Sequence, residues 1–243
     1  MKALVIGGSN GIGLSIVLAL LSRDEISCVY VVDKSPFPEE YLHKKVCYSF
    51  LDLTQNQMIS SILDCPLNDI NALYITVGFG RLDLFQDIES QYINDSFSVN
   101  TIAPIMIIQQ FYNQLLTCNP FECAIMVSIA GRLSSPLFSV YSATKAALSM
   151  FIEAVNIELE MQGSTNRILE VSPGSLKGTS FNGEKSEPSL TEQLALDIIM
   201  RAANKETLFI PQYDEVFRDV LSRYHNDPHQ FGIESFIYKQ KRK

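Results

Sequence analysis

The segment VIGGSNGIGLSIV (residues 5–17) joins an apolar run to a helical pattern through a turn rich in glycine. The apolar run is typical of a buried strand, and the helical pattern extends to about residue 22. Gly7, Gly11 and Gly13 have no side chains at the positions where the backbone must bend tightly and approach a ligand closely. The free N–H groups and the dipole at the start of the following helix favour an anionic ligand such as a pyrophosphate.

Asp33 ends the apolar run CVYVVD (28–33), twenty residues beyond Gly13. A carboxylate here can accept hydrogen bonds from both ribose hydroxyls of an adenosine, although an aspartate that merely starts a loop gives the same pattern. Strand, turn, helix and acid together predict a dinucleotide site. Asp33 would also repel a 2′-phosphate at ~4 Å by up to roughly 4 kcal/mol at moderate dielectric, which Lys34 offsets in part. Because Asn10 in the turn is uncharged, the sequence favours NAD(H) over NADP(H).

Short apolar runs alternate with helical patterns along the whole chain. Strands are predicted at 2–7, 28–33, 45–50, 72–77, 123–128, 167–172 and 207–211. Helices are predicted near 11–22, 54–64, 91–117, 141–161, 191–204 and 212–225. Strand followed by helix, repeated, predicts an α/β fold: a single-domain, Rossmann-like, doubly wound parallel sheet of about seven strands with helices on both faces.

No linker rich in proline, glycine or serine divides the chain, so residues 1–243 are predicted to form one dinucleotide-binding, catalytic domain. The irregular stretch 173–190, which is rich in Gly, Ser and Glu, is predicted to be a substrate lid. Residues 227–243 are predicted to be a C-terminal tail. Its basic residues are expected to face solvent, and they are Lys239, Lys241, Arg242 and Lys243.

Composition argues against several classes of function. A formal net charge of −8 disfavours a nucleic-acid or anionic-membrane partner. Five cysteines without a CxxC pair are predicted to be reduced, and three histidines without ligands at metal spacing predict no metal site. Asp227 and Pro228 argue against a single helix carrying His225 and His229. MKALVIGG leaves no room for a signal peptide and no apolar run approaches ~20 residues, so we expect a soluble cytoplasmic protein.

The segment YSATK (141–145) places a phenol and an ammonium four residues apart, on one face of a predicted helix. Such a pair also occurs by chance on solvated helices. Free tyrosine has a pKa of about 10, which is too high for acid–base work near neutrality. A nearby ammonium should lower the pKa of the phenol, so Tyr141 and Lys145 are a candidate catalytic pair.

Further motifs accompany this pair in a fixed order along the chain. They are GGSNGIG (7–13), LDLT (51–54), VNTIAP (99–104), VSIAG (127–131), YSATK (141–145) and SPG (172–174). From residue 2 to about residue 180 the chain therefore resembles the short-chain dehydrogenase/reductase family, in its compact single-domain branch. Thirteen residues separate Ser128 from Tyr141, as in the family pattern. The joint occurrence of these motifs is far more specific than any one of them.

The resemblance implies an NAD(P)(H)-dependent oxidoreductase that interconverts an alcohol and a ketone or aldehyde by hydride transfer. It implies that Tyr141 exchanges a proton with the substrate oxygen while Ser128 positions that oxygen. Lys145 would also hold the nicotinamide ribose, and Asn100 would order a water that relays protons toward it. The resemblance assigns cofactor binding to Gly7, Ser9, Asn10, Gly11, Ile12, Gly13, Asp33, Asp52, Leu53, Gly78, Tyr141, Lys145, Pro173, Gly174 and Thr179.

Two segments depart from the family pattern. The family's NNAG appears as ITVG (75–78), so Ile75 and Thr76 replace asparagines that stabilise the sheet and line the adenosine side. The C-terminus lacks the usual DGG ending, which favours a homodimer over a homotetramer. We expect the helices at 91–117 and 141–161 to form the contact, since small residues there permit close approach. These residues are Ala143, Ala146, Ala147 and Ala154.

The loops predict a partly apolar pocket for a small alcohol or carbonyl substrate. Its candidate residues are Phe79, Leu133, Pro136, Leu137, Phe138 and Phe181. Arg132 and Lys177 either meet an anionic group or, as we expect, face solvent. Two other functions stay open. One is a regulator that senses the dinucleotide without turnover, which only the replaced asparagines favour; the other is an epimerase or dehydratase, for which the segment after the lid is too short.

Overall fold

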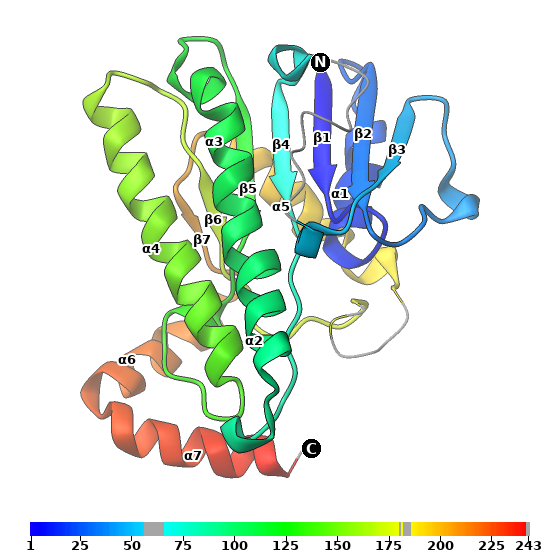
Figure 1. The fold of residues 1–243 in the computed structure, drawn as a ribbon. Helices are drawn as coiled ribbons and strands as arrows, with labels where there is room; N and C mark the ends of the chain where they lie inside the picture. Colours follow the sequence, from blue (N-terminus) through cyan, green and yellow to red (C-terminus); the bar gives the residue numbers. More distant parts are fainter. Residues whose placement is uncertain (56–65, 180, 182–185, 242–243) are drawn as a thin grey trace.

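The computed structural model of the protein describes residues 1–55, 66–179, 181 and 186–241. Within these residues seven strands form one sheet in the order β3–β2–β1–β4–β5–β6–β7, and all neighbouring pairs are parallel. The strands are β1 (Lys2–Ile6), β2 (Cys28–Asp33), β3 (Val46–Phe50), β4 (Ala72–Ile75), β5 (Glu122–Met126), β6 (Leu169–Val171) and β7 (Leu208–Phe209). The predicted doubly wound parallel sheet is confirmed (Figure 1).

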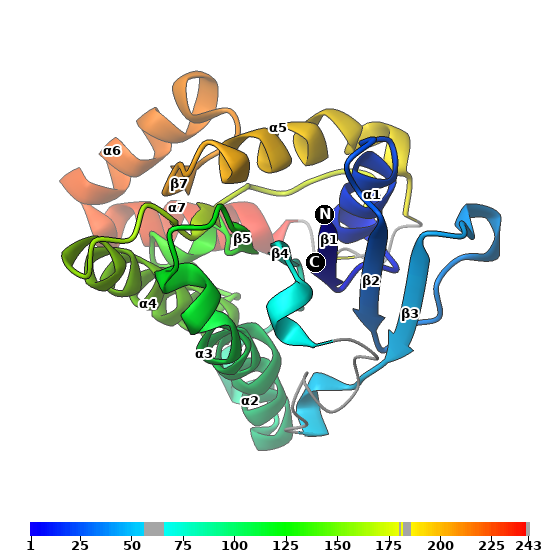
Figure 2. The same ribbon diagram turned by 90° about the horizontal axis from the view of Figure 1, so that it is seen from above.

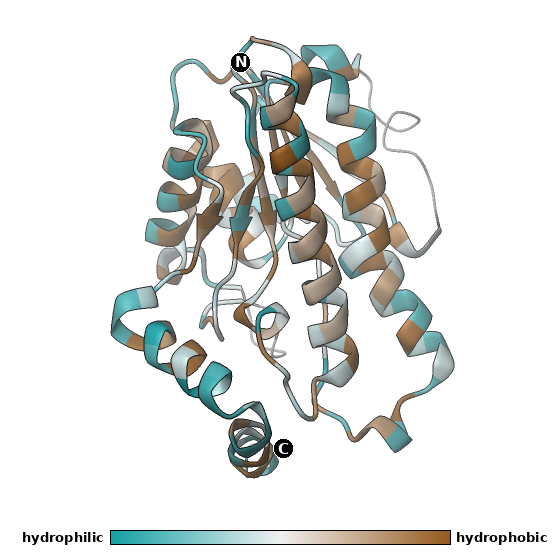
Figure 3. Ribbon diagram, turned by 90° about the vertical axis from the view of Figure 1, so that its left-hand side faces the viewer, coloured by the Kyte–Doolittle hydropathy of each residue, from teal (hydrophilic) through white to brown (hydrophobic). Residues whose placement is uncertain are grey.

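Helices cover both faces of the sheet (Figure 2). The helices are α1 (Gly11–Leu21), α2 (Ser90–Phe97), α3 (Ala103–Leu116), α4 (Ser139–Met161), α5 (Glu192–Ala203), α6 (Arg218–Asn226) and α7 (Pro228–Gln240). Apolar side chains of α3 and α4 form one core cluster with the sheet, and those of α1 and α5 form a second. The central strands therefore contribute apolar side chains to both clusters. In Figure 3 the strands are coloured largely as hydrophobic.

The strand order reverses at β1, which has β2 on one side and β4 on the other. The connections after β1 and β4 therefore leave the sheet in opposite directions, and a crevice opens beyond the carboxyl ends of these two strands. This is where the glycine-rich turn lies, because Gly7 follows β1 directly. The fold thus brings the sequence segment that predicted it to the place where such sheets bind ligands.

The helix predicted at 91–117 is divided. A π-helical turn, η6 (Ser98–Ile102), separates α2 from α3 and includes Asn100. The helix predicted at 54–64 lies almost entirely outside the described residues, which here end with the short 3₁₀ turn η2 (Leu53–Gln55). Part of the predicted lid at 173–190 is also outside them.

The predicted C-terminal tail at 227–243 is wrong for most of its length, since Pro228–Gln240 form α7. Asp227 caps this helix by accepting a hydrogen bond from the Gln230 N–H, and Pro228 occupies the first turn, where its missing N–H costs nothing. These are the residues that argued against a helix through His225 and His229, and α6 does end at Asn226. Figure 1 shows α7 below the carboxyl ends of the strands.

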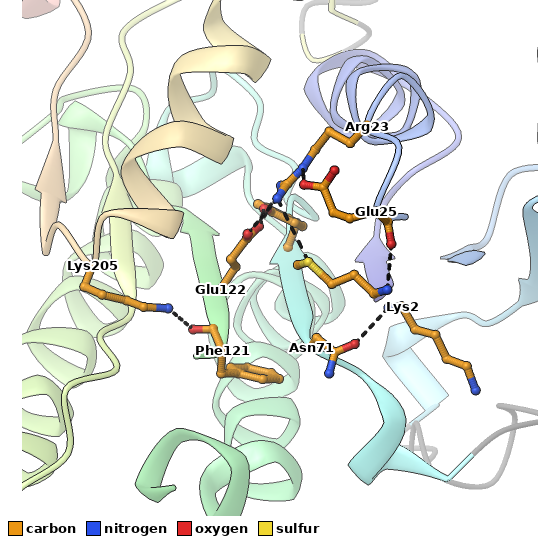
Figure 4. Close-up of polar contacts among 9 residues, drawn as sticks. Lys2, Arg23, Glu25, Asn71, Phe121, Glu122 and Lys205 are labelled. Carbon is orange, nitrogen blue, oxygen red and sulfur yellow. Dashed lines mark hydrogen bonds and ion pairs between the residues drawn. The ribbon is translucent and has the colours of Figure 1, made fainter. Parts of the chain in front are cut away.

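A polar cluster closes the opposite, amino end of the sheet (Figure 4). Glu122 at the start of β5 is buried, and its carboxylate accepts two hydrogen bonds of 3.0 Å from Arg23 and one of 2.5 Å from the Tyr74 hydroxyl. The hydrogen bonds that Arg23 donates to Glu122 raise the pKa of Arg23 above its usual range. Burial, with the carboxylate beside it, raises the pKa of the Tyr74 phenol. The Arg23 guanidinium and the Tyr74 phenol therefore both keep their protons at neutral pH.

Replacing Glu122 with Ala should lower the free energy of unfolding by about 2–4 kcal/mol, because the Tyr74 hydroxyl and the Arg23 guanidinium lose their acceptor in a buried place. Urea denaturation at neutral pH measures this. The control is Asp69→Ala, which removes the partner of Lys2 in a half-exposed ion pair and should cost about 1 kcal/mol or less. Equal effects of the two substitutions would contradict the importance of the buried cluster.

Candidate active site

The glycine-rich turn is held against β4 by close backbone contact. Gly7 has a φ of +87° and Gly11 a φ of +50°, both in the left-handed region that favours glycine. A Cβ at Gly13 would lie 2.0 Å from the Gly7 carbonyl oxygen, so the first turn of α1 can approach β1 only because residue 13 has no side chain. Gly11, Ile12 and Gly13 at the start of α1 consequently line the crevice, where the Gly11 N–H donates a hydrogen bond of 2.9 Å to the Ser186 hydroxyl.

Thr76 has a structural role that the sequence did not reveal. Its hydroxyl lies 2.9 Å from the Ile6 carbonyl and 3.1 Å from the Gly7 carbonyl, and it thereby links the end of β4 to the glycine turn. A Cβ at Gly7 would lie 2.8 Å from this hydroxyl. The replacement of asparagine by threonine at this position therefore leaves the turn fixed to the sheet.

Asp33 reaches back to the glycine turn from the end of β2. One carboxylate oxygen accepts a hydrogen bond of 3.0 Å from the Ser9 N–H, and the other accepts one of 2.9 Å from the Ser35 N–H. The Ser9 hydroxyl is buried and has no hydrogen-bond partner within the described ranges. Buried hydroxyls normally have a hydrogen-bond partner, so the Ser9 hydroxyl is a group that a bound ligand or water can complete.

Asp52 follows β3, beside the same crevice. Its carboxylate accepts hydrogen bonds from the Thr54 N–H (3.0 Å) and the Thr54 hydroxyl (2.9 Å), and these lower its pKa. The carboxylate is thus ionised and fixed in orientation. Asp33, Asp52 and Leu53 line one wall of the crevice together.

Tyr141 and Lys145 leave α4 on one face, as the spacing predicts, and both are buried. The Lys145 ammonium lies 6.0 Å from the centre of the Tyr141 ring and donates a hydrogen bond of 2.9 Å to the Met126 carbonyl. A Cβ at Gly78 would lie 3.0 Å from Lys145 Nζ, so the glycine after β4 leaves room for the ammonium. The pair therefore faces the carboxyl ends of β4 and β5.

The expected lowering of the Tyr141 pKa is wrong for the protein as described. Burial raises the pKa of Tyr141 to about 12, and the Ser128 hydroxyl opposes this only in part. Burial also lowers the pKa of Lys145 to about 7. The sequence showed the opposite charge nearby but not the depth of burial, and desolvation of the phenolate is here the larger effect.

Asn100 joins the loop after β4 to α4. Its amide accepts a hydrogen bond from the Phe79 N–H (3.0 Å) and donates to the Phe79 carbonyl (2.9 Å) and to the Thr144 hydroxyl (3.1 Å). The π-helical turn places this side chain inward, and such turns are frequent at functional sites. Asn100 therefore holds the surroundings of Gly78 and Lys145 in place.

Ser128 begins a 3₁₀ turn, η7 (Ile129–Gly131), and its hydroxyl accepts a hydrogen bond of 3.1 Å from the Ala130 N–H. Behind it, the buried carboxylate of Glu170 accepts hydrogen bonds from Arg132 (2.7 Å), Ser149 (2.9 Å) and Ser172 (2.7 Å). The expectation that Arg132 faces solvent is wrong. Glu170 connects the loop that carries Ser128, the helix that carries Tyr141, and the loop after β6.

One cavity of about 1280 Å³ joins the glycine turn to the Tyr141–Lys145 pair. The predicted site residues that line it are Gly7, Asn10, Gly11, Ile12, Gly13, Asp33, Asp52, Leu53, Gly78, Ser128, Tyr141, Lys145, Pro173, Gly174 and Thr179. Ser9 and Asn100 lie behind this surface and act through their contacts. Thr179 lies beside Gly11, at van der Waals distance from where a Cβ would be.

The cavity continues into an apolar part beside Tyr141. Phe138 and Phe181 lie with ring centres 5.4 Å and 5.3 Å from that of Tyr141. Phe79 and Leu133 also line this part, whereas the predicted Pro136 and Leu137 are not among the lining residues.

The C-terminal segment supplies a further wall that the sequence reading missed. The lining residues from this segment are Phe217, Val220, Arg223, Phe231, Glu234, Ser235, Tyr238 and Lys239. The last five of these residues, from Phe231 to Lys239, are spaced as on one face of a helix. This spacing is the signal in the sequence that could have predicted a helix here.

Neither a metal centre nor a membrane span is found in the part of the chain that the structure describes. No group of three or more His, Cys, Asp or Glu residues there could hold a metal ion. No helix among these residues is both long enough and apolar enough to cross a bilayer. Cys28, Cys47, Cys118 and Cys123 are not in disulfide bonds, and the thiols of Cys28 and Cys47 lie 3.5 Å apart. Cys65 lies outside the described residues.

Residues 1–189 match the model of the family described as short chain dehydrogenase. Among curated proteins, the chain is 28% identical over 188 residues to the "Uncharacterized oxidoreductase TDA5" of Saccharomyces cerevisiae, a match that covers 75% of this chain and 57% of that protein. The chain thus spans little more than half the length of this relative. The family match covers most of the chain, and the chain belongs to the short-chain dehydrogenase family.

Solved structures share the fold. A short-chain dehydrogenase/reductase from Burkholderia phymatum, in complex with NAD, superposes with a TM-score of 0.74 at 15% identity and covers 93% of both chains. A short chain dehydrogenase from Burkholderia cenocepacia, in complex with NADP, superposes with a TM-score of 0.73 at 20% identity and covers 96% of both chains. The arrangement of sheet and helices is therefore that of the family.

The pKa of Lys145 predicts a pH-dependent contribution to stability. Burial places it at about 7 in the folded protein, well below its value in an unfolded chain, so between about pH 7 and 10 the unfolded chain binds one more proton. The free energy of unfolding should therefore rise with pH across this window. Lys145→Met removes this titrating ammonium. The free energy of unfolding of wild type minus that of the variant should therefore increase from pH 7 to 10, as measured by urea denaturation without dinucleotide. A difference that stays constant there would contradict the buried ammonium.

Proposed function

We propose that the protein is an NAD(P)(H)-dependent oxidoreductase that interconverts an alcohol and a ketone or aldehyde, with Tyr141 as the proton donor and acceptor. One observation carries the proposal: the cavity that contains the glycine turn and Asp33 also contains Ser128, Tyr141 and Lys145. Membership of the short-chain dehydrogenase family supports it, as do neighbours solved with NAD and with NADP.

The residues present fit a dinucleotide. The turn lacks side chains at Gly7, Gly11 and Gly13, so its backbone can approach a ligand closely at the start of α1, where the helix dipole favours a pyrophosphate. A pyrophosphate there would take the place of the Ser186 hydroxyl, which now accepts a hydrogen bond from the Gly11 N–H. Asp33 ends β2 with its carboxylate fixed, and Asp52 is ionised beside it, so both can accept hydrogen bonds from an adenosine. The buried Ser9 hydroxyl without a partner lies at the same place.

A bound nicotinamide dinucleotide supplies or accepts the hydride. The protein's own side chains supply or accept the proton. At neutral pH the buried phenol of Tyr141 keeps its proton and can donate it to a carbonyl oxygen that gains negative charge, which is general acid catalysis. Ser128, at the edge of the same cavity, can donate a hydrogen bond to that oxygen and orient it.

The reverse direction requires the phenolate, and Lys145 is the group that can stabilise it. Its ammonium lies close to the Tyr141 ring, and its pKa near 7 allows it to lose and regain a proton at neutral pH. Asn100, held by Phe79 and Thr144, borders the same ammonium near Gly78. We propose that it orders a water there that returns protons to Lys145.

The alternative of a sensor without turnover rested on the replaced asparagines. The Thr76 hydroxyl links the glycine turn to β4, so this departure leaves the cradle in place. Both members of the Tyr141–Lys145 pair are present and buried in the cavity. We therefore propose the enzyme rather than the sensor.

Tyr141→Phe removes only the hydroxyl, so dinucleotide binding should survive while reduction of a ketone falls by about 10²–10⁴-fold. Absorbance loss of the reduced dinucleotide measures the rate, and protein fluorescence measures binding. Lys145→Met should lower turnover and also weaken binding, because the same ammonium serves phenol and ribose. In the double variant the loss of turnover should be much smaller than the two single losses combined, because Lys145 has less to contribute once the phenol is absent.

Tyr112→Phe is the matched control, because its hydroxyl accepts from Gln162 on an exposed face away from the cavity. It should behave as wild type. Nearly full ketone reduction by Tyr141→Phe would show that the phenol is not the acid.

We propose NAD(H) as the preferred cofactor, from the position of Asp33. Wild type should bind NADH more tightly than NADPH, and Asp33→Ser should narrow the difference by removing the charge that repels a 2′-phosphate. Parallel fluorescence titrations measure both constants. Asp24→Ser, in the exposed loop before β2, makes the same change of net charge and should leave the ratio unaltered. Tighter binding of NADPH by wild type would mean that Lys34 outweighs the acid.

We also propose a homodimer through α3 and α4. Ala143, Ala146, Ala147 and Ala154 are exposed along α4, and Met161, further along the same helix, is 81% exposed. An apolar helix surface with small residues is suited to packing against its symmetry mate. Light scattering at micromolar concentration should give twice the chain mass, and Ala147→Glu should give a monomer. A stable wild-type monomer would contradict the proposal.

A further inference from the structure

The last helix brings a lysine to the apolar part of the cavity. The Lys239 ammonium donates hydrogen bonds to the Ser135 hydroxyl and, at 3.0 Å, to the Pro136 carbonyl. It also lies 5.5 Å from the centre of the Phe138 ring. An ammonium has three N–H donors, so these two contacts leave one donor for a ligand in the cavity that Lys239 lines.

The positive charge of Lys239 is not neutralised within the described part of the chain. Its two hydrogen-bond partners are uncharged, and no carboxylate among the described residues lies within ion-pair distance of it. Glu234, on the same helix, is paired with Arg223 at 2.6 Å and also accepts from Gln230. Burial lowers the pKa of Lys239 to about 8, and no carboxylate opposes this shift. A half-buried charge without a counter-charge is costly unless a ligand supplies one.

Lys239 and Tyr141 share one aromatic neighbour. The Phe138 ring centre lies 5.4 Å from that of Tyr141 and 5.5 Å from the Lys239 ammonium. Phe181 lies 6.4 Å from Phe138, and Leu133 lines the same part of the cavity. A substrate with its carbonyl oxygen at Tyr141 would therefore pass along apolar side chains before it reaches the ammonium.

We propose that Lys239 is a specificity-determining residue that binds a carboxylate of the substrate, so the substrate is a keto acid, or the corresponding hydroxy acid, with an apolar spacer between its two ends. This inference rests on the proposed function of the same site. A carboxylate is favoured over a phosphate because Lys239 offers one positive charge, which a single negative charge balances.

The test uses levulinate and its longer homologues with the ketone at the penultimate carbon, each paired with its methyl ester, which removes the charge and keeps the carbon chain. Binding is measured by calorimetry in the presence of oxidised dinucleotide, which cannot reduce the ketone, and turnover by the absorbance loss of reduced dinucleotide. The variants are Lys239→Met, which removes the charge, and Lys239→Arg, which keeps it. Lys241→Met is the control, because Lys241 lies just beyond α7 and is exposed.

In wild type at least one acid should bind, and react in kcat/KM, about tenfold or more better than its ester. Lys239→Met should abolish this preference, mainly through KM; Lys239→Arg should retain most of it and Lys241→Met all of it. The inference would be overturned if wild type bound and reduced the acid and its ester equally well. It would also be overturned if Lys239→Met lowered kcat/KM by the same factor for both.

The two proposals fail separately. Turnover of ketones without preference for the acid would leave the proposed function intact and refute the role of Lys239. Acid binding that depends on Lys239, without turnover of any ketone, would support the carboxylate site and refute the oxidoreductase. Absence of both acid binding and turnover would overturn both.

Discussion

The contact between the end of β4 and the turn after β1 determines where the crevice lies. The Thr76 hydroxyl reaches the carbonyls of Ile6 and Gly7, and the first turn of α1 sits against the Gly7 carbonyl with no space for a side chain at Gly13. These contacts are between neighbouring parallel strands whose connections leave in opposite directions. Any loosening here would move the start of α1, which lines the cavity with Gly11, Ile12 and Gly13, away from the ends of both strands.

The two ends of the sheet meet different physical demands. At the amino end, Glu122 is satisfied by Arg23 and Tyr74, so the buried charge there is balanced by the protein itself. At the carboxyl end, Lys145 is buried with only a carbonyl as its partner, and the Ser9 hydroxyl has none among the described residues. The buried charge at the amino end is therefore balanced by the protein, whereas the buried charge of Lys145 at the carboxyl end is not balanced by a carboxylate among the described residues.

The fold and much of the site follow from local patterns in the sequence. Apolar runs gave the strands, and the spacing of Tyr141 and Lys145 on one helix placed them together because four residues make about one turn. Contacts between residues that lie far apart in the sequence could not be inferred from local patterns. Arg132 was expected in solvent because its partner Glu170, 38 residues away, is visible only once β6 lies behind the turn at Ser128. The pKa of Tyr141 was misjudged for a similar reason, since burial depends on packing by segments as remote as Phe181.

The two parts of the cavity are lined by different parts of the chain, and α7 lines only one of them. Residues 1–189, which match the family, contain the glycine turn, the acids after β2 and β3, and the Tyr141–Lys145 pair. The surface beyond Phe138 is completed by the final helix, with Lys239 at its far end. Members of a family built in this way can share one reaction and diverge in what they accept by changing a single contiguous segment, because the exchange leaves the reacting groups and their supports untouched.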